Sequence, residues 1–210
     1  MDGGRHAAVR TLALSLTLLL AGFAGLRAAT DRFQAFTTES ARRVAVRERP
    51  RVIPAVPLQN QFAASISPAD FGGRWLVVDF IYTNCPTLCT SLGSEFAQLE
   101  RRLAGPIAEG RVQLLSIGFD LAHDTPAALM EYVALSGGHG PAWQAARPVT
   151  AEGLRDLVAA FGITIIPDRF GGFTHNAAIH LVDPQGRLVD IMDVGSPDDV
   201  VAEIGRRLPP

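Results

Sequence analysis

The stretch WLVVDFIYTNCPTLC, residues 75–89, decides the fold of this chain. Its first eight residues form an almost continuous apolar run, which is typical of a central strand covered on both faces. Pro86 predicts the start of a helix, because the first helical turn does not need the N–H that proline lacks. Apolar residues then recur three and four apart, which predicts one buried helix face that ends at Gly105-Pro106. These positions are Leu88, Leu92, Phe96, Leu99 and Leu103.

The patterns on the C-terminal side predict the rest of a single α/β domain. Further strands are predicted at 112–119, 177–182 and 187–191, and further helices between 124 and 137, at 151–161 and at 198–208. Asp124 is predicted to cap the first of these helices, since a carboxylate there can accept the N–H groups of the first turn. Asp183-Pro184-Gln185-Gly186 predicts a turn that joins the last two strands as a hairpin. This order predicts a thioredoxin-like domain, with a central mixed sheet flanked by helices; a flavodoxin-like sheet fits the terminal hairpin less well.

The N-terminal segment has the composition of an export signal or a membrane anchor. Arg5 and Arg10 precede an uncharged, leucine-rich run at 11–26. The run is shorter than the roughly 20 residues of a spanning helix, so a signal cleaved after Ala24 and a short retained anchor both stay open. If the segment is retained, its positive charges place the N-terminus in the cytoplasm and the domain in the periplasm or outside. We therefore expect a signal peptide or anchor at 1–29, a tether at 30–60 and the folded domain at 61–210.

Composition excludes several classes of function. The chain has 210 residues and a formal net charge of −2, which argues against a nucleic-acid binder. Its basic residues are all arginine. A catalytic lysine, a Schiff base and a Walker-type phosphate loop are excluded, because each requires the lysine amine.

Two cysteines, Cys85 and Cys89, lie at the predicted junction of strand and helix. A helix N-terminus favours the thiolate over the thiol. Residues four apart on a helix have Cβ atoms about 5–6 Å apart, whereas a disulfide needs about 3.5–4.5 Å. The spacing therefore favours a soft metal ion held by two thiolates. A structural disulfide or reversible dithiol exchange stays open, because oxidation requires only a rearranged first turn.

A metal held by two thiolates needs a further ligand, and the chain offers five histidines: His6, His123, His139, His175 and His180. His180 alternates with apolar neighbours in a predicted strand, which indicates the opposite, solvent-facing side. His139 lies in a glycine-rich loop. His175 is favoured, because it enters the terminal hairpin, which passes near the first helix in a thioredoxin-like sheet. Two cysteines and one histidine suit copper(I) above all, and copper(II) stays open if water or a carboxylate joins them, whereas zinc requires a fourth ligand.

Three stretches together resemble the Sco/SenC proteins of cytochrome c oxidase assembly. They are VVDFIYTNCPTLC (77–89), LLSIGFDLAHDTPAALMEYV (114–133) and THNAAIHLVDPQGRLVDI (174–191). The resemblance covers roughly residues 70–207. It implies a membrane-tethered, thioredoxin-like domain that holds a copper ion. Carried over by position, the copper ligands are Cys85, Cys89 and His175.

The same resemblance implies the protein's partners. The copper would be delivered to the dinuclear centre of cytochrome c oxidase subunit II, or exchanged with another copper chaperone.

The sequence departs from the family at Thr90, where proline is common, and at Thr174, where an aspartate commonly precedes the metal histidine. The second change removes a negative charge that supports the imidazole.

Two other functions use the same thiols. A thiol–disulfide oxidoreductase that keeps the oxidase cysteines reduced would use Cys85 and Cys89 as its only catalytic groups and would not need His175. A redox or copper sensor is the third reading. Asp79, inside the central strand, is interpreted as a buried polar anchor, with a proton-transfer role for the thiols as the alternative. For Asp120 a role near the metal stays open as an alternative to a structural one.

Overall fold

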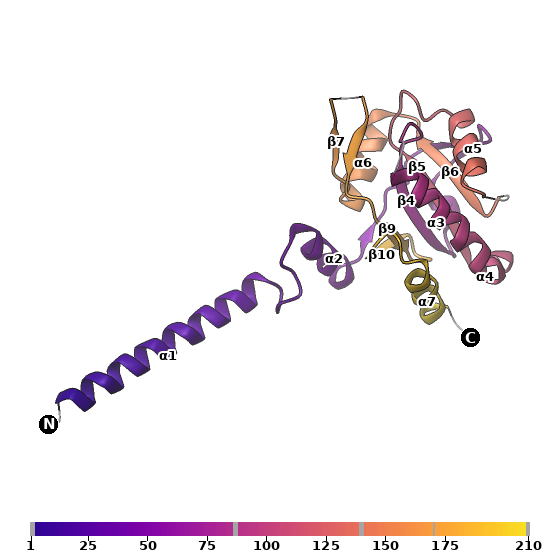
Figure 1. The fold of residues 1–210 in the computed structure, drawn as a ribbon. Coiled ribbons are helices and arrows are strands. Elements are labelled where there is room, and N and C mark those ends of the chain that lie inside the picture. The colour runs from indigo at the N-terminus through magenta and orange to yellow at the C-terminus, as the bar shows by residue number, and fades with distance from the viewer. Residues whose placement is uncertain (1–2, 86–87, 139–140, 170, 209–210) are drawn as a thin grey trace. The chain divides into compact units, whose positions relative to one another are not determined.

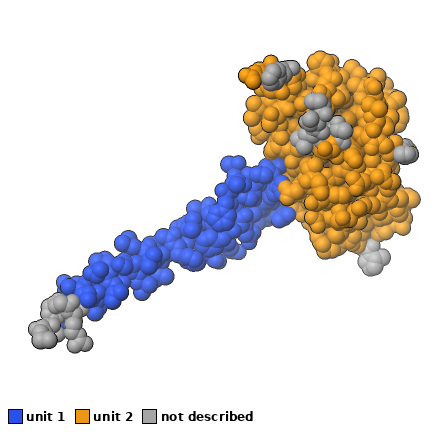
Figure 2. Space-filling view, in the orientation of Figure 1, with its two compact units in different colours: residues 1–48 blue, residues 49–210 orange. Residues whose placement is uncertain are grey.

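The computed structural model describes residues 3–85, 88–138, 141–169 and 171–208. The chain divides into two compact units, residues 1–48 and 49–210 (Figure 2).

The first unit contains two helices, α1 (Gly3–Ala29) and α2 (Thr38–Glu48). Within α1, the 24 residues His6–Ala29 are long and apolar enough to cross a membrane. The helical segment is thus longer than the uncharged run at 11–26. Helix α2 lies in a segment that the sequence indicated as an irregular tether. On this helix Glu39 forms ion pairs with Arg42 and Arg43, three and four residues away.

The second unit is built on an eight-stranded mixed sheet, in the order β1-β10-β9-β4-β5-β6-β2-β3 (Figure 1). The strands are β1 (Arg51–Val52), β2 (Leu58–Asn60), β3 (Ser65–Ile66), β4 (Trp75–Ile81), β5 (Val112–Gly118), β6 (Trp143–Pro148), β9 (Ile179–Val182) and β10 (Arg187–Met192). The apolar run that begins at Trp75 is β4, near the middle of the sheet. Its residues from Leu76 to Ile81 are all buried, as the continuous apolar pattern predicts.

Parallel and antiparallel pairing divides this sheet into two parts. Strand β4 runs parallel to β5, and β5 runs parallel to β6. On the other side β9 pairs antiparallel with β4 and with β10, so the predicted terminal hairpin is confirmed. Strands β1 and β2 are part of the sheet, although they lie in the 30–60 segment expected as a tether. A separate two-stranded hairpin consists of β7 (Ile165–Pro167) and β8 (Phe173–His175).

Helices cover both faces of the sheet. The helices are α3 (Leu88–Arg102), α4 (Ala104–Ala108), α5 (Pro126–Leu135), α6 (Ala151–Phe161) and α7 (Pro197–Arg207), with a short 3₁₀ helix, η1 (Pro68–Phe71), before β4. Phe96 of α3 packs against Trp143 of β6 on one face. Phe161 of α6 packs edge-on against Phe80 of β4 on the other face. The central strand is therefore enclosed on both sides.

Two helix boundaries differ from the sequence-based expectation. Gly105-Pro106 does not end helical structure: α3 ends at Arg102, and the pair lies inside the short helix α4, where proline is tolerated in the first turn. Helix α5 begins at Pro126, but its cap is Thr125, whose hydroxyl accepts the N–H of Ala128. The prediction that Asp124 caps this helix was wrong, because its carboxylate bonds instead to the backbone of Thr83, on the turn after β4.

Candidate metal centre

Cys85 follows the central strand on a tight turn. Its backbone N–H donates to the carbonyl oxygen of Tyr82, 3.2 Å away, and its side chain is half-buried. Cys89 lies in the first turn of α3, as predicted. Its side chain, like Pro86 and Thr87, lies outside the described part of the structure. The backbone thus brings both cysteines to the point where strand β4 passes into helix α3.

The turn before Cys85 is held by a buried carboxylate. Oδ1 of Asp124 accepts the backbone N–H of Thr83 at 2.7 Å and its hydroxyl at 2.8 Å. Oδ2 of Asp124 accepts the N–H of Asp120 at 2.8 Å. Asp124 is fully buried, so these bonds replace the water that its carboxylate has lost. The loop after β5 and the turn after β4 are therefore joined through one side chain.

His175 is the last residue of β8 and is 9% exposed. The prediction that it enters the terminal hairpin was wrong, since it lies on the separate β7–β8 hairpin. Its Nε2 lies 3.0 Å from the carbonyl oxygen of Phe80 on β4. A carbonyl oxygen only accepts, so Nε2 carries the proton and Nδ1 keeps the lone pair. A metal-binding histidine commonly has this arrangement, in which one ring nitrogen donates to a fixed acceptor and the other is left to the metal.

Aromatic rings surround the imidazole of His175. The ring centroid of Phe119 lies 5.1 Å from that of His175, and the centroid of Tyr82 lies 6.5 Å away. Phe173 packs edge-on against both Phe119 and Tyr82. This apolar enclosure lowers the pKa of His175, because burial disfavours the charged imidazolium. The neutral imidazole that results is the form that binds metal ions.

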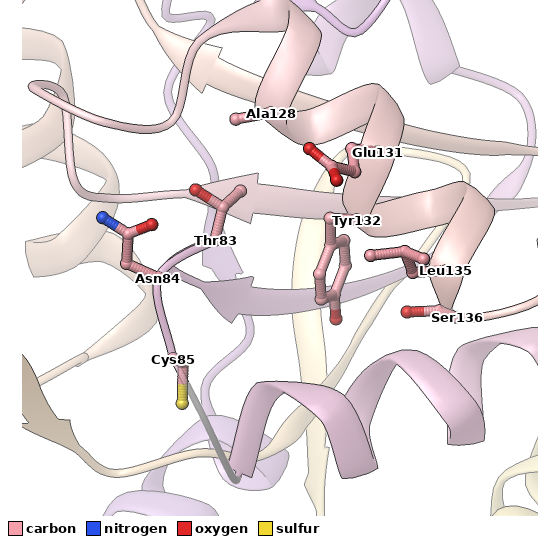
Figure 3. A pocket seen from close by; sticks show the side chains of 8 residues that line it. All are labelled: Thr83, Asn84, Cys85, Ala128, Glu131, Tyr132, Leu135 and Ser136. Atoms are coloured by element: carbon pink, nitrogen blue, oxygen red, sulfur yellow. The ribbon is translucent and has the colours of Figure 1, made fainter.

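A pocket of about 390 Å³ opens beside Cys85. One side is the turn Thr83, Asn84 and Cys85, and the other is one face of α5 (Figure 3). The α5 residues that line it are Ala128, Glu131, Tyr132 and Leu135, together with Ser136, the residue that follows the helix. Leu135 at its edge is 82% exposed. The half-buried cysteine is thus reached through a pocket with polar and apolar walls.

The other predicted polar residues take structural positions. His180 is buried, not solvent-facing. Its side chain points away from Ile179 and Leu181, as the alternation indicated, but helix α6 covers that face of the sheet. Phe161 of α6 packs against the His180 ring. His123 is largely exposed, and its Nδ1 lies 2.7 Å from Oδ2 of Asp120. His6 lies in α1, and His139 falls outside the described residues.

Asp79 is fully buried in β4, and burial raises its pKa to about 7. Ser116 of β5 lies opposite Asp79 in the sheet, and neither carboxyl oxygen of Asp79 has a hydrogen-bond partner among the described residues. Glu95 of α3 faces it and is also buried, with a raised pKa caused by the same loss of water. Two acids on β4 and α3 are therefore buried near one another in the core.

Among the residues whose side chains are described, no three histidine, cysteine or acidic groups lie together as a metal cluster. The side chain of Cys89 is outside that set, so the three-ligand site stays a prediction.

Several residues that position the site were missed from the sequence. Tyr82 and Phe119 looked like ordinary core residues. Asn176, next to the histidine, holds the β7–β8 hairpin: its Oδ1 accepts the N–H of Thr164, and its amide donates to the carbonyl oxygen of Gly162.

Comparisons with known proteins place this chain in a family. The SCO1/SenC family model matches residues 44–208, which is more than half of the chain. A putative copper-binding protein of Stutzerimonas stutzeri is 31% identical over 144 residues, covering 67% of this chain and 68% of that protein.

Solved structures share the fold, among them two of Sco proteins. The copper-bound structure of Bradyrhizobium japonicum ScoI is 22% identical, with a TM-score of 0.62, and the match covers 75% of this chain and 99% of that one. BsSco, a Sco-family cytochrome c oxidase assembly protein with a disulfide switch, is also 22% identical, with a TM-score of 0.64 and coverage of 75% and 94%. The thioredoxin-like fold predicted from the sequence is confirmed. This chain belongs to the SCO1/SenC family.

Proposed function

We propose that this protein binds copper through Cys85, Cys89 and His175 and delivers it to the dinuclear copper centre of cytochrome c oxidase subunit II. The observation that carries the proposal is the hydrogen bond between Nε2 of His175 and the carbonyl oxygen of Phe80. It leaves Nδ1 as the ligating nitrogen on a buried, neutral ring. Phe80 itself lies on β4, the strand that leads to Cys85.

The donor set suits copper(I). Thiolates are soft ligands, and two thiolates with one imidazole satisfy an ion that accepts low coordination numbers. Cys89, in the first turn of α3, lies where the positive end of the helix favours the thiolate. Copper(I) is the cargo in this proposal, and the three side chains are its temporary ligands.

Delivery requires that the ligands be exchanged one at a time for those of the recipient. Cys85 is half-buried and faces the pocket between its own turn and helix α5. That pocket gives an incoming thiolate or imidazole room to approach the Cys85 side of the site. His175 is buried within its aromatic enclosure, so we expect Cys85 to be the first ligand displaced.

The apolar helix α1 supports a location at a membrane. By length and composition, the segment His6–Ala29 can cross a bilayer. We propose that residues 1–29 are retained as an anchor, or cleaved after export, and that the copper-binding domain faces the periplasm or the outside. The basic residues that precede the apolar run, Arg5 and Arg10, favour a cytoplasmic N-terminus.

A second candidate function is thiol–disulfide exchange that keeps the recipient's cysteines reduced. The position of Cys89 favours it, because a thiol in the first turn of a helix is an activated nucleophile. The disulfide switch identified in BsSco, which shares this fold, points the same way. This function needs both cysteines and not the imidazole.

Copper titration of the reduced full-length chain in detergent tests the proposal. We expect one copper(I) per chain, with X-ray absorption showing sulfur and nitrogen neighbours. Cys85→Ser should weaken the binding by at least about tenfold, since even outer-shell changes at metal sites commonly cost that much. A copper environment made only of oxygen and nitrogen, or an unchanged affinity in Cys85→Ser, would contradict copper binding at this site.

A further inference from the structure

Asp124 ties the turn before Cys85 to the neighbouring loop after β5. The N–H of Cys85 bonds to the carbonyl oxygen of Tyr82, so residues 82–85 form a turn with Thr83 and Asn84 at its centre. Asp124 binds Thr83 at both its backbone N–H and its hydroxyl. The carboxylate therefore fixes a central residue of the turn that ends at Cys85.

The surroundings of this carboxylate leave it little freedom. Asp124 is fully buried, and its second oxygen accepts the N–H of Asp120. A Cβ atom at Gly118 would lie 2.8 Å from Oδ2 of Asp124, so only glycine at that position leaves room for the carboxylate. Both oxygens are occupied, and the side chain cannot move without breaking a bond to one of the two loops.

We propose that Asp124 is a positioning residue for copper: it sets the place of Cys85 through Thr83 and so determines the affinity of the site. This inference rests on the proposed function. It also gives the buried aspartate of the DTP segment a role different from the helix cap that the sequence indicated. Thr125 supplies the cap, so Asp124 is not needed to start helix α5.

Two substitutions separate positioning from simple loss of stability. Asp124→Asn keeps the volume but places an amide NH₂ against either the Thr83 or the Asp120 N–H, so one of the bonds is lost. Thr83→Val removes only the hydroxyl bond and keeps Asp124. Thr83→Ser retains the hydroxyl and serves as the conservative rescue.

Asp183→Asn is the matched control. Asp183 is also a buried aspartate that holds a turn, because its Oδ1 accepts the N–H groups of Gln185 and Arg187. It follows β9, whose Val182 pairs with Leu76 at the start of β4, whereas Cys85 lies beyond the end of that strand. Its loss should cost stability without disturbing the cysteine turn.

The experiment measures copper(I) affinity of the full-length chain by competition with a chromophoric chelator. We expect Asp124→Asn and Thr83→Val to weaken binding about tenfold or more, as outer-shell changes at metal sites commonly do. Thr83→Ser and Asp183→Asn should stay within about threefold of the unaltered chain. Affinity unchanged in Thr83→Val and in folded Asp124→Asn, or weakened equally in Asp183→Asn, would overturn the proposal.

A second measurement keeps this test independent of the proposed function. If the unaltered chain binds no copper, the proposed function has failed, and positioning is then tested by alkylation of Cys85 in a Cys89→Ser background. Release of the turn should speed alkylation in Asp124→Asn and Thr83→Val by roughly threefold or more, with no change in Asp183→Asn. An unchanged rate in both would contradict positioning.

Discussion

The hydroxyl of Tyr82 lies 3.2 Å from the carbonyl oxygen of Phe173 and 3.3 Å from its backbone nitrogen. The hydroxyl donates to the carbonyl oxygen and accepts a hydrogen bond from the backbone N–H. Tyr82 begins the turn that ends at Cys85, and Phe173 begins the strand that ends at His175. One phenol thus links the cysteine turn to the histidine hairpin, although Tyr82 and Phe173 lie 91 residues apart in the chain.

Removing the Tyr82 hydroxyl should loosen the β7–β8 hairpin that carries His175. Tyr82→Phe keeps the ring packing but leaves the N–H and the carbonyl of Phe173 without their partner. We expect a loss of about 1 kcal/mol in the free energy of unfolding and a copper(I) affinity weakened several-fold, to be measured by denaturant titration and chelator competition. An unchanged copper affinity would show that the link does not position the ligands.

Oxidation of the two cysteines should prevent copper binding. Cys85 and Cys89 are four residues apart at a helix start, so a disulfide between them requires only a rearranged first turn. We expect mild oxidant to produce this bond and to abolish copper binding. Mass spectrometry should show the loss of two hydrogens from one tryptic peptide. If both thiols can still be alkylated after the oxidant treatment, this prediction fails.

The buried Asp79 should make stability depend on pH. Its pKa of about 7 lies above the ordinary aspartate value of 3.8, so the unfolded chain loses this proton first as pH rises. As pH rises from the pKa of Asp79 in the unfolded chain to its pKa in the folded chain, the free energy of unfolding falls progressively. Above the folded pKa the full loss of stability is present.

Between about pH 5 and about pH 8, this group should lower the free energy of unfolding by about 2–3 kcal/mol. Asp79→Asn should remove that part of the slope, while Glu95 keeps its own contribution of the same sign. Denaturant titrations at the two pH values give the measurement. Identical slopes in the two proteins would mean that Asp79 does not hold its proton in the core.

The sequence predicted the core elements well, because their patterns are local. The apolar run of β4 and the three-and-four spacing of α3 depend only on near neighbours. Strand β6 was missed, since WQAARP has neither strict alternation nor a continuous apolar run. The alternation around His180 gave the correct side of β9, but sequence alone did not reveal that helix α6 covers that side.

The sequence supplied the candidate ligands, which stay a prediction, but not the residues that support them. Cys85 and Cys89 were proposed from the strand–helix junction, and His175 from its expected place near that junction and from the family resemblance. The acceptor of the His175 proton is the carbonyl oxygen of Phe80, 95 residues earlier, and any residue type could supply it. Asp124 was assigned to the nearest helix, because a local motif does not show that Thr83, 41 residues away, competes for the carboxylate.

The most direct test compares His175→Ala with Cys85→Ser in a strain that lacks this protein, with cytochrome c oxidase activity as the readout. His175→Ala removes one copper ligand but no sulfur, so thiol exchange survives while copper binding should weaken by about tenfold or more. We expect both variants to fail to restore oxidase activity, whereas the unaltered chain restores it. Restoration by His175→Ala, with Cys85→Ser still inactive, would contradict copper delivery and establish thiol reduction as the function.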